Sequence, residues 1–289
     1  MNKEFDILLE SSFIHMPGIS EKTEKKIWGM GILTWHDMEE NISNPEIPVS
    51  SKDVIKSYII GSRRALENVN VGFFRENFPS REYWRLYPNF KSRTLFLDIE
   101  TNKLPKELNE ITVIGTLYKG KFKSFVKDIN FNDFIPLLED CSMIVTYNGN
   151  LFDIPCIERT FNIEEKNYIS LDLRWIFKRL GYTGGLKSIE KQLGISRPDY
   201  LKDLNGYTAV LLWEKYKSKQ YNALHVLRRY CLEDVKNLVF LLHIAYNKLC
   251  NEIEFPRKIN PLSEKFKWEI KIDCDFSVVE EVKKERHKK

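Results

Sequence analysis

The sequence predicts an α/β protein with a mixed β-sheet flanked by helices. Three observations predict this class: a series of apolar, β-forming runs, a helical pattern within that series, and helical patterns that dominate afterwards. The predicted strands cover residues 94–99, 111–118, 122–126, 142–147 and 168–171, and the helical pattern within the series covers residues 131–140. With 289 residues, 43% of them hydrophobic, the chain has ample apolar material for a core.

The cysteines and the hydropathy pattern restrict the compartment. There are five cysteines, an odd number, and none of them form a C-x-x-C pair, which argues against a disulfide framework or a zinc knuckle. No N-terminal apolar run resembles a signal peptide, and nowhere do 18 apolar residues follow one another. We therefore expect a reduced, cytoplasmic protein that does not span a membrane.

The positive charge is concentrated at the C-terminus. The formal net charge is +4, and the last seven residues alone contain five Lys or Arg and one Glu. Residues 1–282 therefore sum to zero, and a nucleic-acid groove would have to come from local clustering of basic side chains. Such a tail is more often a solubilising end than a binding arm.

The N-terminal segment alternates helical patterns with tight turns. Helical patterns cover residues 3–10 and 21–29, and a further helix starts near residue 35. We expect Ser20 to be the N-cap of the second helix, with Glu24 close to the capping-box position.

A Pro-Gly-Ile turn precedes Ser20, and this helix, turn and helix resemble the helix-hairpin-helix family. The resemblance implies that backbone N–H groups near Gly18 and Ser20 bind a nucleic-acid phosphate at the helix N-terminus. The match is partial, since Ser20 stands where the family has a second glycine. A small helical module with a purely structural role is the alternative.

The change from helical to β patterns at Arg93 divides the chain. Between the N-terminal module and this point, the aromatic-rich stretch at residues 73–87 is typical of core or interface packing. We expect a helix-hairpin-helix-like module at residues 1–45, a connector at 46–92, an α/β domain at 93–250, and a C-terminal extension with the basic tail at 251–289.

Two carboxylates end the first predicted strand. Side chains alternate along a strand, so Asp98 and Glu100 lie on the same face, about 7 Å apart. Two like charges at the end of a buried strand are unfavourable unless a cation lies between them, and a hard divalent metal is the natural candidate. A solvated strand end that begins a turn is the alternative.

A third carboxylate follows the predicted strand at 142–147. Asn148 and Gly149 supply a tight turn, and Asp153 opens a helical pattern after it. Taken alone, Asp153 is better explained as the N-cap of that helix than as a metal ligand.

The fourth carboxylate lies in a long helical pattern over residues 221–249. Tyr230 and Asp234 are four residues apart and therefore share one helical face, roughly 6 Å apart. Because Glu is the better helix former, an Asp beside Glu233 indicates that the shorter acid is required.

Together these segments resemble the three exonuclease motifs of the DEDD superfamily, whose members are DnaQ-like with a ribonuclease-H-like fold. In chain order they are Asp98-x-Glu100 on a strand, Asn148-x(4)-Asp153 at a strand-to-helix turn, and Tyr230-x(3)-Asp234 on a helix. The tyrosine places the chain with the DEDDy branch, because Arg229 stands where the other branch has histidine. The motif wording is also similar to the proofreading domain of family B DNA polymerases. With the N-terminal module, the closest resemblance is to YprB-type ribonuclease-H-like proteins, strongest over residues 93–245.

The resemblance implies a metal-dependent reaction. Two Mg²⁺ or Mn²⁺ ions would relieve the repulsion of four carboxylates and support in-line phosphodiester hydrolysis. Asp98 would bridge both ions, Glu100 and Asp234 would bind the ion that activates water, and Asp153 would help to place the other ion, mostly through water. Tyr230 would orient the attacking water, since a phenol with a pKa near 10 is a poor base.

The resemblance also implies a substrate site. Thr101, Leu104, Asn148 and Phe152 would border the terminal nucleotide, with removal proceeding 3′ to 5′. Asp172 would cap a helix and shape the site. The spacing of the residues alone predicts hydrolysis and leaves open whether removal starts at the 3′ or the 5′ end.

We therefore expect a metal-dependent 3′–5′ exonuclease acting on single-stranded ends of DNA or RNA. Two alternatives are a structure-selective endonuclease and a non-catalytic nucleic-acid-binding protein that keeps the fold. The sequence leaves protein partners open and does not distinguish DNA from RNA.

Overall fold

A mixed β-sheet lies at the centre of the computed structural model, which describes residues 7–49, 51–102, 110–163, 167–263, 270, 272 and 274–286. Within these residues the sheet has five strands in the order β3-β2-β1-β4-β5. Their bounds are Thr94–Thr101 for β1, Ile111–Tyr118 for β2, Lys121–Val126 for β3, Met143–Thr146 for β4 and Ile169–Asp172 for β5. The first three strands are antiparallel, and β1, β4 and β5 are parallel, which confirms the predicted α/β class and mixed sheet.

A two-residue turn connects β2 and β3. Its residues Lys119 and Gly120 both have positive φ, 49° and 74°. A turn of this kind matches the right-handed twist of the flanking strands, and glycine adopts this conformation without steric cost.

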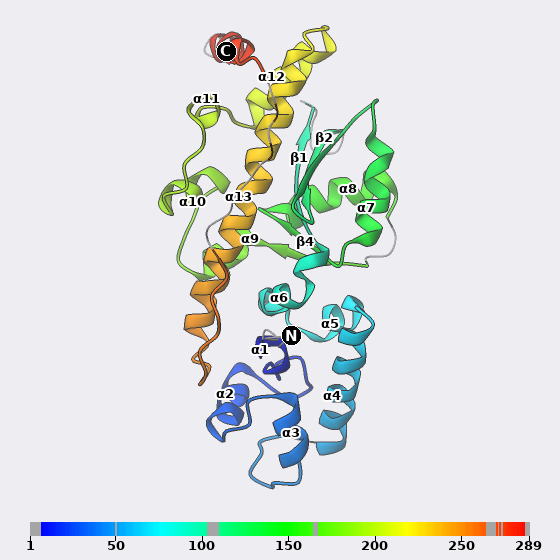
Figure 1. The fold of residues 1–289 in the computed structure, drawn as a ribbon, viewed down its shortest axis with the longest axis vertical. Coiled ribbons are helices and arrows are strands. Elements are labelled where there is room, and N and C mark those ends of the chain that lie inside the picture. The colour runs from blue at the N-terminus through cyan, green and yellow to red at the C-terminus, as the bar shows by residue number, and fades with distance from the viewer. Residues whose placement is uncertain are drawn as a thin grey trace.

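Helices cover both faces of the sheet (Figure 1). On one face, α7 (Ile135–Asp140) and α8 (Asp153–Phe161) pack on the alternate residues Leu95, Leu97 and Ile99 of β1. The 31-residue helix α13 (Asn222–Glu252) runs along the other face. The alternation along β1 therefore directs Asp98 and Glu100 toward α13.

The predicted helix at residues 131–140 is wrong in one respect. Residues Phe131–Phe134 form a 3₁₀ turn, and α7 begins only at Ile135, with Pro136 in its first turn. Proline lacks the N–H that a helix interior needs, so it is accommodated where that donor has no intrahelical partner.

The remaining C-terminal helices lie beside and above α13 (Figure 1). They are α9 (Leu173–Arg179), α10 (Leu186–Gln192), α11 (Asp199–Lys202), α12 (Gly206–Lys217) and α14 (Ser277–Arg286).

Short helices form the N-terminal part, below the sheet in Figure 1. They are α1 (Ile7–Glu10), α2 (Glu21–Gly29), α3 (Trp35–Asn41), α4 (Lys52–Glu67) and α5 (Val71–Asn77), followed by the 3₁₀ helices Ser80–Leu86 and Lys91–Arg93 with α6 (Tyr87–Phe90) between them.

The cap of α2 is confirmed, but its capping box is not. The Ser20 hydroxyl accepts a hydrogen bond from the Thr23 N–H. Glu24 instead accepts the N–H groups of Phe13 and Ile14, at 2.7 and 3.1 Å, and is buried. Its carboxylate thus stabilises the turn that precedes the helix, because that turn folds back over it.

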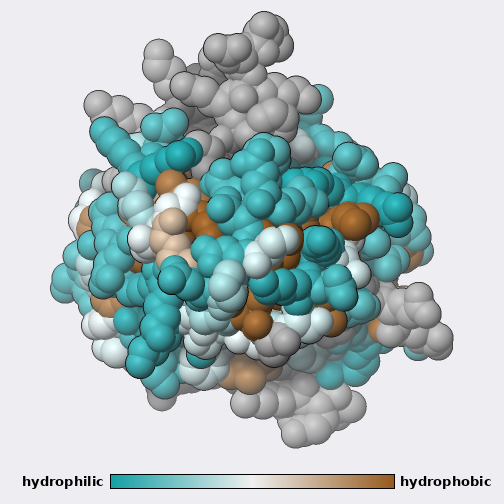
Figure 2. All heavy atoms as spheres, turned by 90° about the horizontal axis from the view of Figure 1, so that it is seen from below, coloured by the Kyte–Doolittle hydropathy of each residue, from teal (hydrophilic) through white to brown (hydrophobic). Residues whose placement is uncertain are grey.

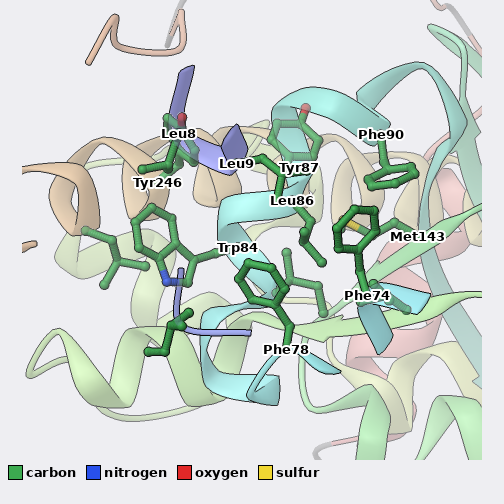
Figure 3. Close-up of a cluster of buried hydrophobic side chains, with 14 of the residues drawn as sticks. Leu8, Leu9, Phe74, Phe78, Trp84, Leu86, Tyr87, Phe90, Met143 and Tyr246 are labelled. Atoms are coloured by element: carbon green, nitrogen blue, oxygen red, sulfur yellow. The ribbon is translucent and has the colours of Figure 1, made fainter. Parts of the chain in front are cut away.

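One hydrophobic cluster joins the N-terminal helices to the sheet (Figure 3). Its side chains come from α1, from the aromatic-rich segment, from β4 and from α13. Trp84 meets Tyr246 edge to face with 5.6 Å between ring centroids, and Phe74 meets Phe90 at 5.9 Å. The prediction that the aromatic-rich stretch packs in the core is therefore confirmed.

A buried chain of ion pairs crosses the same junction. Arg85 donates to Glu24 on one side and to Glu82 on the other, each at 2.8 Å, and both carboxylates are buried. Arg179, at the end of α9, donates to the second oxygen of Glu82 at 2.7 Å. Charges alternate along this chain, so each buried carboxylate has a cationic partner.

The lower end of the molecule, formed by the N-terminal helices, is mainly polar. Figure 2 shows hydrophilic residues over most of this face, with small hydrophobic areas between them. In the part of the chain that the structure describes, no helix has both the length and the apolar character needed to cross a bilayer.

We predict that Arg85→Met destabilises the protein by about 3–5 kcal/mol, because it leaves two buried carboxylates without their shared cation. The measurement is the free energy of unfolding in urea. The matched control is Arg63→Ala, which removes a solvent-accessible ion pair to Glu39 and should cost at most about 1 kcal/mol. Equal losses for the two variants would contradict the assigned role of Arg85.

Candidate active site

A glycine on β2 allows α13 to approach the sheet. Gly115 is the register partner of Asp98, and a β-carbon on it would lie 2.7 Å from the Cβ of Cys231. That distance is shorter than any normal carbon contact, so only glycine fits there without displacing the helix. The close approach brings Tyr230 and Asp234 over the carboxylate end of β1.

Three carboxylates converge at this point. Asp98, Glu100 and Asp234 each offer an oxygen, and these oxygens lie within 4.8 Å of one another. Burial raises the pKa of all three above the usual carboxyl values, and for Asp98 and Glu100 the neighbouring carboxylates raise it further. The structure therefore brings together Asp98 and Glu100, predicted as a pair, with Asp234 from α13.

Asp153 lies next to this group and outside it. Its Oδ1 accepts the N–H of Ile99, between the two acids of β1, at 3.2 Å. The interpretation of Asp153 as an N-cap is wrong: Phe152 occupies that position, and no side-chain cap bond forms there. Burial raises the pKa of Asp153 to about 7, although the hydrogen bond from the Ile99 N–H lowers it in part.

The pairing of β1 explains why the Ile99 N–H is available. β1 and β4 are in register from Thr94 to Phe96 and no further. Beyond that point no strand of the described residues pairs with β1 on this side, and the carboxylate of Asp153 accepts the Ile99 N–H instead.

Asp172 shapes the adjacent turn, as predicted. It caps α9 by accepting the Arg174 N–H, and it also accepts the N–H of Asn148 at 2.7 Å and of Asn150 at 3.2 Å. Asn148 has a left-handed backbone with φ of 66°. One carboxylate therefore orders both the β4–α8 turn and the start of α9.

Two cations that the sequence analysis missed lie beside the carboxylates. The Lys187 Nζ lies 4.9 Å from the centre of the Tyr230 ring, and the Arg197 guanidinium lies 5.8 Å from it. The ammonium of Lys187 is buried, and among the described residues it has no hydrogen-bond partner. Burial lowers the pKa of Lys187, while the nearby Asp234 opposes that shift.

Arg197 contacts two carboxylates, those of Glu190 and Asp234. It donates to both oxygens of Glu190 at 2.6 Å and also contacts Asp234 Oδ1. Asn237 donates to Glu190 at 2.9 Å. Burial opposes the charge of Arg197, but Asp234 and Glu190 outweigh it and raise its pKa. Arg197 therefore offsets part of the negative charge of Asp234 and orients its carboxylate.

A pocket of about 380 Å³ opens onto this group. It is lined by the acids of β1, by Tyr230 and Asp234 of α13, by Lys187, and by Asn205 and Gly206 at the N-terminus of α12. Acids and cations face one space, so the pocket presents both metal-binding oxygens and groups that attract an anion.

The predicted substrate residues lie in several places. Thr101, the last residue of β1, pairs with Ile111 of β2 after a register shift between Glu100 and Thr101. Asn148 and Phe152 flank the short 3₁₀ turn Gly149–Leu151 before Asp153. Leu104 lies outside the described residues.

The predicted phosphate-binding residues Gly18 and Ser20 are exposed in the N-terminal part, among helices packed below the sheet. The Ser20 hydroxyl is used by the helix cap and by a contact to Thr23 at 3.0 Å.

The donor set fits a hard divalent cation. The three convergent ligands are all carboxylates, and oxygen ligands of this type suit Mg²⁺ and Mn²⁺. Arg197 contacts one oxygen of Asp234, and a carboxylate has a second oxygen.

We predict that, in EDTA, the stability of the protein falls as the pH rises from about 4 to about 7. In this window the folded protein holds a proton on Asp153, whose ordinary pKa is 3.8, and the unfolded chain has lost it. Each such proton gives a slope of about 1.4 kcal/mol per pH unit. The measurement is urea unfolding across this range.

Asp153→Asn should reduce that slope by the share of one proton, about 1.4 kcal/mol per pH unit, while Asp133→Asn, at an exposed position, should leave it as in the wild type. Adding Mn²⁺ at pH 7 should restore the stability that the wild-type protein loses in EDTA. A slope unaffected by Asp153→Asn would contradict the assignment.

Three comparisons relate the chain to known proteins. A search of curated proteins found no match. Among solved structures, the chain is similar to the family B DNA polymerase from the hyperthermophilic archaeon Pyrobaculum calidifontis, with 16% sequence identity and a TM-score of 0.42. That match covers 53% of this chain and 25% of the polymerase, so the chain spans about a quarter of that protein's length. The model of the RNase_H superfamily matches residues 95–246, more than half of the chain. The chain therefore belongs to the RNase_H superfamily, and the predicted ribonuclease-H-like fold is confirmed.

Proposed function

We propose that the protein is a metal-dependent 3′–5′ exonuclease that removes nucleotides from single-stranded ends of DNA or RNA. Membership of the RNase_H superfamily supports a nuclease in general. The observation that carries the finer proposal is the convergence of Asp98, Glu100 and Asp234 within 4.8 Å, with Asp153 and Tyr230 adjacent, in the order of the DEDDy motifs.

The carboxylates hold the cofactor in this proposal. Asp98, Glu100 and Asp234 would hold the ions directly, and Asp153 would assist from its position beside Ile99. Bound Mg²⁺ or Mn²⁺, two ions in this proposal, would supply an activated water and would stabilise charge on the attacking and leaving oxygens. Arg197, held by Glu190, would keep the Asp234 carboxylate oriented.

Tyr230 acts through its hydroxyl as a hydrogen-bonding group. Burial raises its pKa well above 10, and the nearby carboxylates raise it further. The phenol therefore stays protonated at neutral pH and orients water without removing its proton.

Lys187 supplies positive charge on the substrate side of the site. Lys187 lines the pocket, and its buried ammonium has no hydrogen-bond partner among the described residues. A buried ammonium without an acceptor is unfavourable. A phosphate oxygen of the bound nucleic acid would satisfy it.

We predict that the wild type with Mn²⁺ converts a 5′-labelled single-stranded oligonucleotide into a ladder of products shortened one nucleotide at a time from the 3′ end. Asp98→Asn keeps the size of the side chain but removes its charge, and it should lower the rate by at least roughly 10²–10³-fold. The measurement is gel analysis of DNA and RNA substrates, single-stranded and duplex.

Different products would favour other functions. A single internal cut would support a structure-selective endonuclease and exclude the exonuclease. Binding without any cleavage would support a non-catalytic nucleic-acid-binding protein. The folding control for Asp98→Asn is its urea unfolding curve in EDTA.

We predict that Lys187→Gln lowers the rate constant at saturating substrate by roughly 10²-fold, because the phosphate loses a cation in a buried site. The control is Lys191→Gln, an exposed lysine one turn further along α10, which should retain the wild-type rate. A rate for Lys187→Gln equal to that of the control would remove Lys187 from the mechanism.

A further inference from the structure

The outer face of α9 carries an exposed aromatic ring between two cations. Trp175 is 48% exposed, and the Lys178 Nζ lies 5.2 Å from the centre of its ring. Arg174 precedes it and is also exposed. These three residues are here called the α9 strip.

Packing of α9 does not require this tryptophan. The helix buries Leu173, Ile176 and Phe177 against the core, and these residues form its apolar face. Trp175 lies on the opposite face, where a large ring exposes apolar area to water. Tryptophan is enriched at interfaces, because its ring offers both an apolar face and a polar N–H.

The charge of the strip selects an anionic partner. Arg174 and Lys178 are four residues apart, so they project from the same side of the helix about 6 Å apart. Within the described part of the chain, neither has a carboxylate at ion-pair distance, whereas many other exposed cations of the protein do. Two exposed cations beside an aromatic ring match a backbone phosphate and a stacked base, and the charge of Arg174 also acts on Asp172.

Direct contacts connect the strip to the carboxylate site. The Arg174 guanidinium contacts the Asn148 side chain, and the Asn148 N–H donates to Asp172 at 2.7 Å. Asn148 begins the turn that leads into Asp153, whose carboxylate lies against β1. The strip is therefore linked, through Asn148 and the turn it begins, to Asp153 beside the carboxylates.

We propose that the α9 strip binds single-stranded nucleic acid, with a base stacked on Trp175 and phosphates held by Arg174 and Lys178. The proposal rests on the proposed nuclease function, since it takes the same strand as its occupant. It predicts that oligonucleotides long enough to reach α9 bind more tightly than dinucleotides.

The test compares the binding of a 12-nucleotide single strand and of a dinucleotide, both in EDTA, by fluorescence anisotropy and competition. Trp175→Ala should weaken binding of the longer strand by roughly 5- to 150-fold and leave that of the dinucleotide unchanged. Trp175→Phe should recover most of the loss, because it keeps a stacking face. Tyr221→Ala is the matched control, as it removes another exposed aromatic ring, 66% exposed, at the start of α13.

Lys178→Gln should lower the slope of log affinity against log salt by roughly 0.7, the value for one phosphate contact on a single strand. Wild-type affinity of Trp175→Ala for the longer strand would overturn the proposal, as would an equal loss for both lengths.

The two proposals fail differently. A wild-type protein that hydrolyses nucleic acid but binds the longer strand independently of Trp175 retains its proposed function and lacks this binding surface. A wild-type protein that hydrolyses nothing but loses affinity in Trp175→Ala retains the surface and lacks the activity.

Discussion

Mutual repulsion of buried carboxylates is the constraint around which the upper half of the molecule is built. Asp98, Glu100 and Asp234 approach within 4.8 Å in an interior that disfavours charge. Gly115 makes the approach possible, because α13 could not otherwise come so close to β2. The packing of the rest of the fold holds the three carboxylates together against their repulsion. The cations Arg197 and Lys187 offset part of their negative charge.

The two halves of the structure meet at α9. At its first turn, Asp172 orders the turn that carries Asn148 toward the carboxylates. At its last residue, Arg179 joins the buried ion pairs of Glu82 and Arg85. Both ends of this short helix are thus fixed by charged groups, one belonging to the site and the other to the N-terminal part.

Much of the fold could be predicted from the sequence, because its signals are local. Alternation and apolar runs placed all five strands, and the spacing of Tyr230 and Asp234 set their common face. The 3₁₀ turn before α7 and the use of Glu24 were not predicted. The 3₁₀ turn was missed because Pro136 marks the start of α7 rather than its interior. The use of Glu24 was missed because its partners lie ten or more residues away in the chain.

The cations of the site could not be predicted either, because their partners are distant in the sequence. Arg197 lies 37 residues before Asp234 in the chain, in a segment between two short helices with no motif of its own. Only the folded path around α10 brings it to the carboxylate. Glu190 and Arg197 are seven residues apart, outside the three- and four-residue spacings of helical ion pairs, so their spacing gave no signal either. The catalytic roles given to the predicted site residues are proposals, and the structure supplies the positions of those residues.

The shared core has a consequence for how the protein unfolds. Trp84 and Phe74 pack in the same cluster as Met143 of the sheet and Tyr246 of α13. A fragment starting at residue 93 would present these strand and helix side chains to water, and we expect it to aggregate. The N-terminal helices and the sheet are then one cooperative unit, in which the stability of the nuclease scaffold depends on residues far from any chemistry.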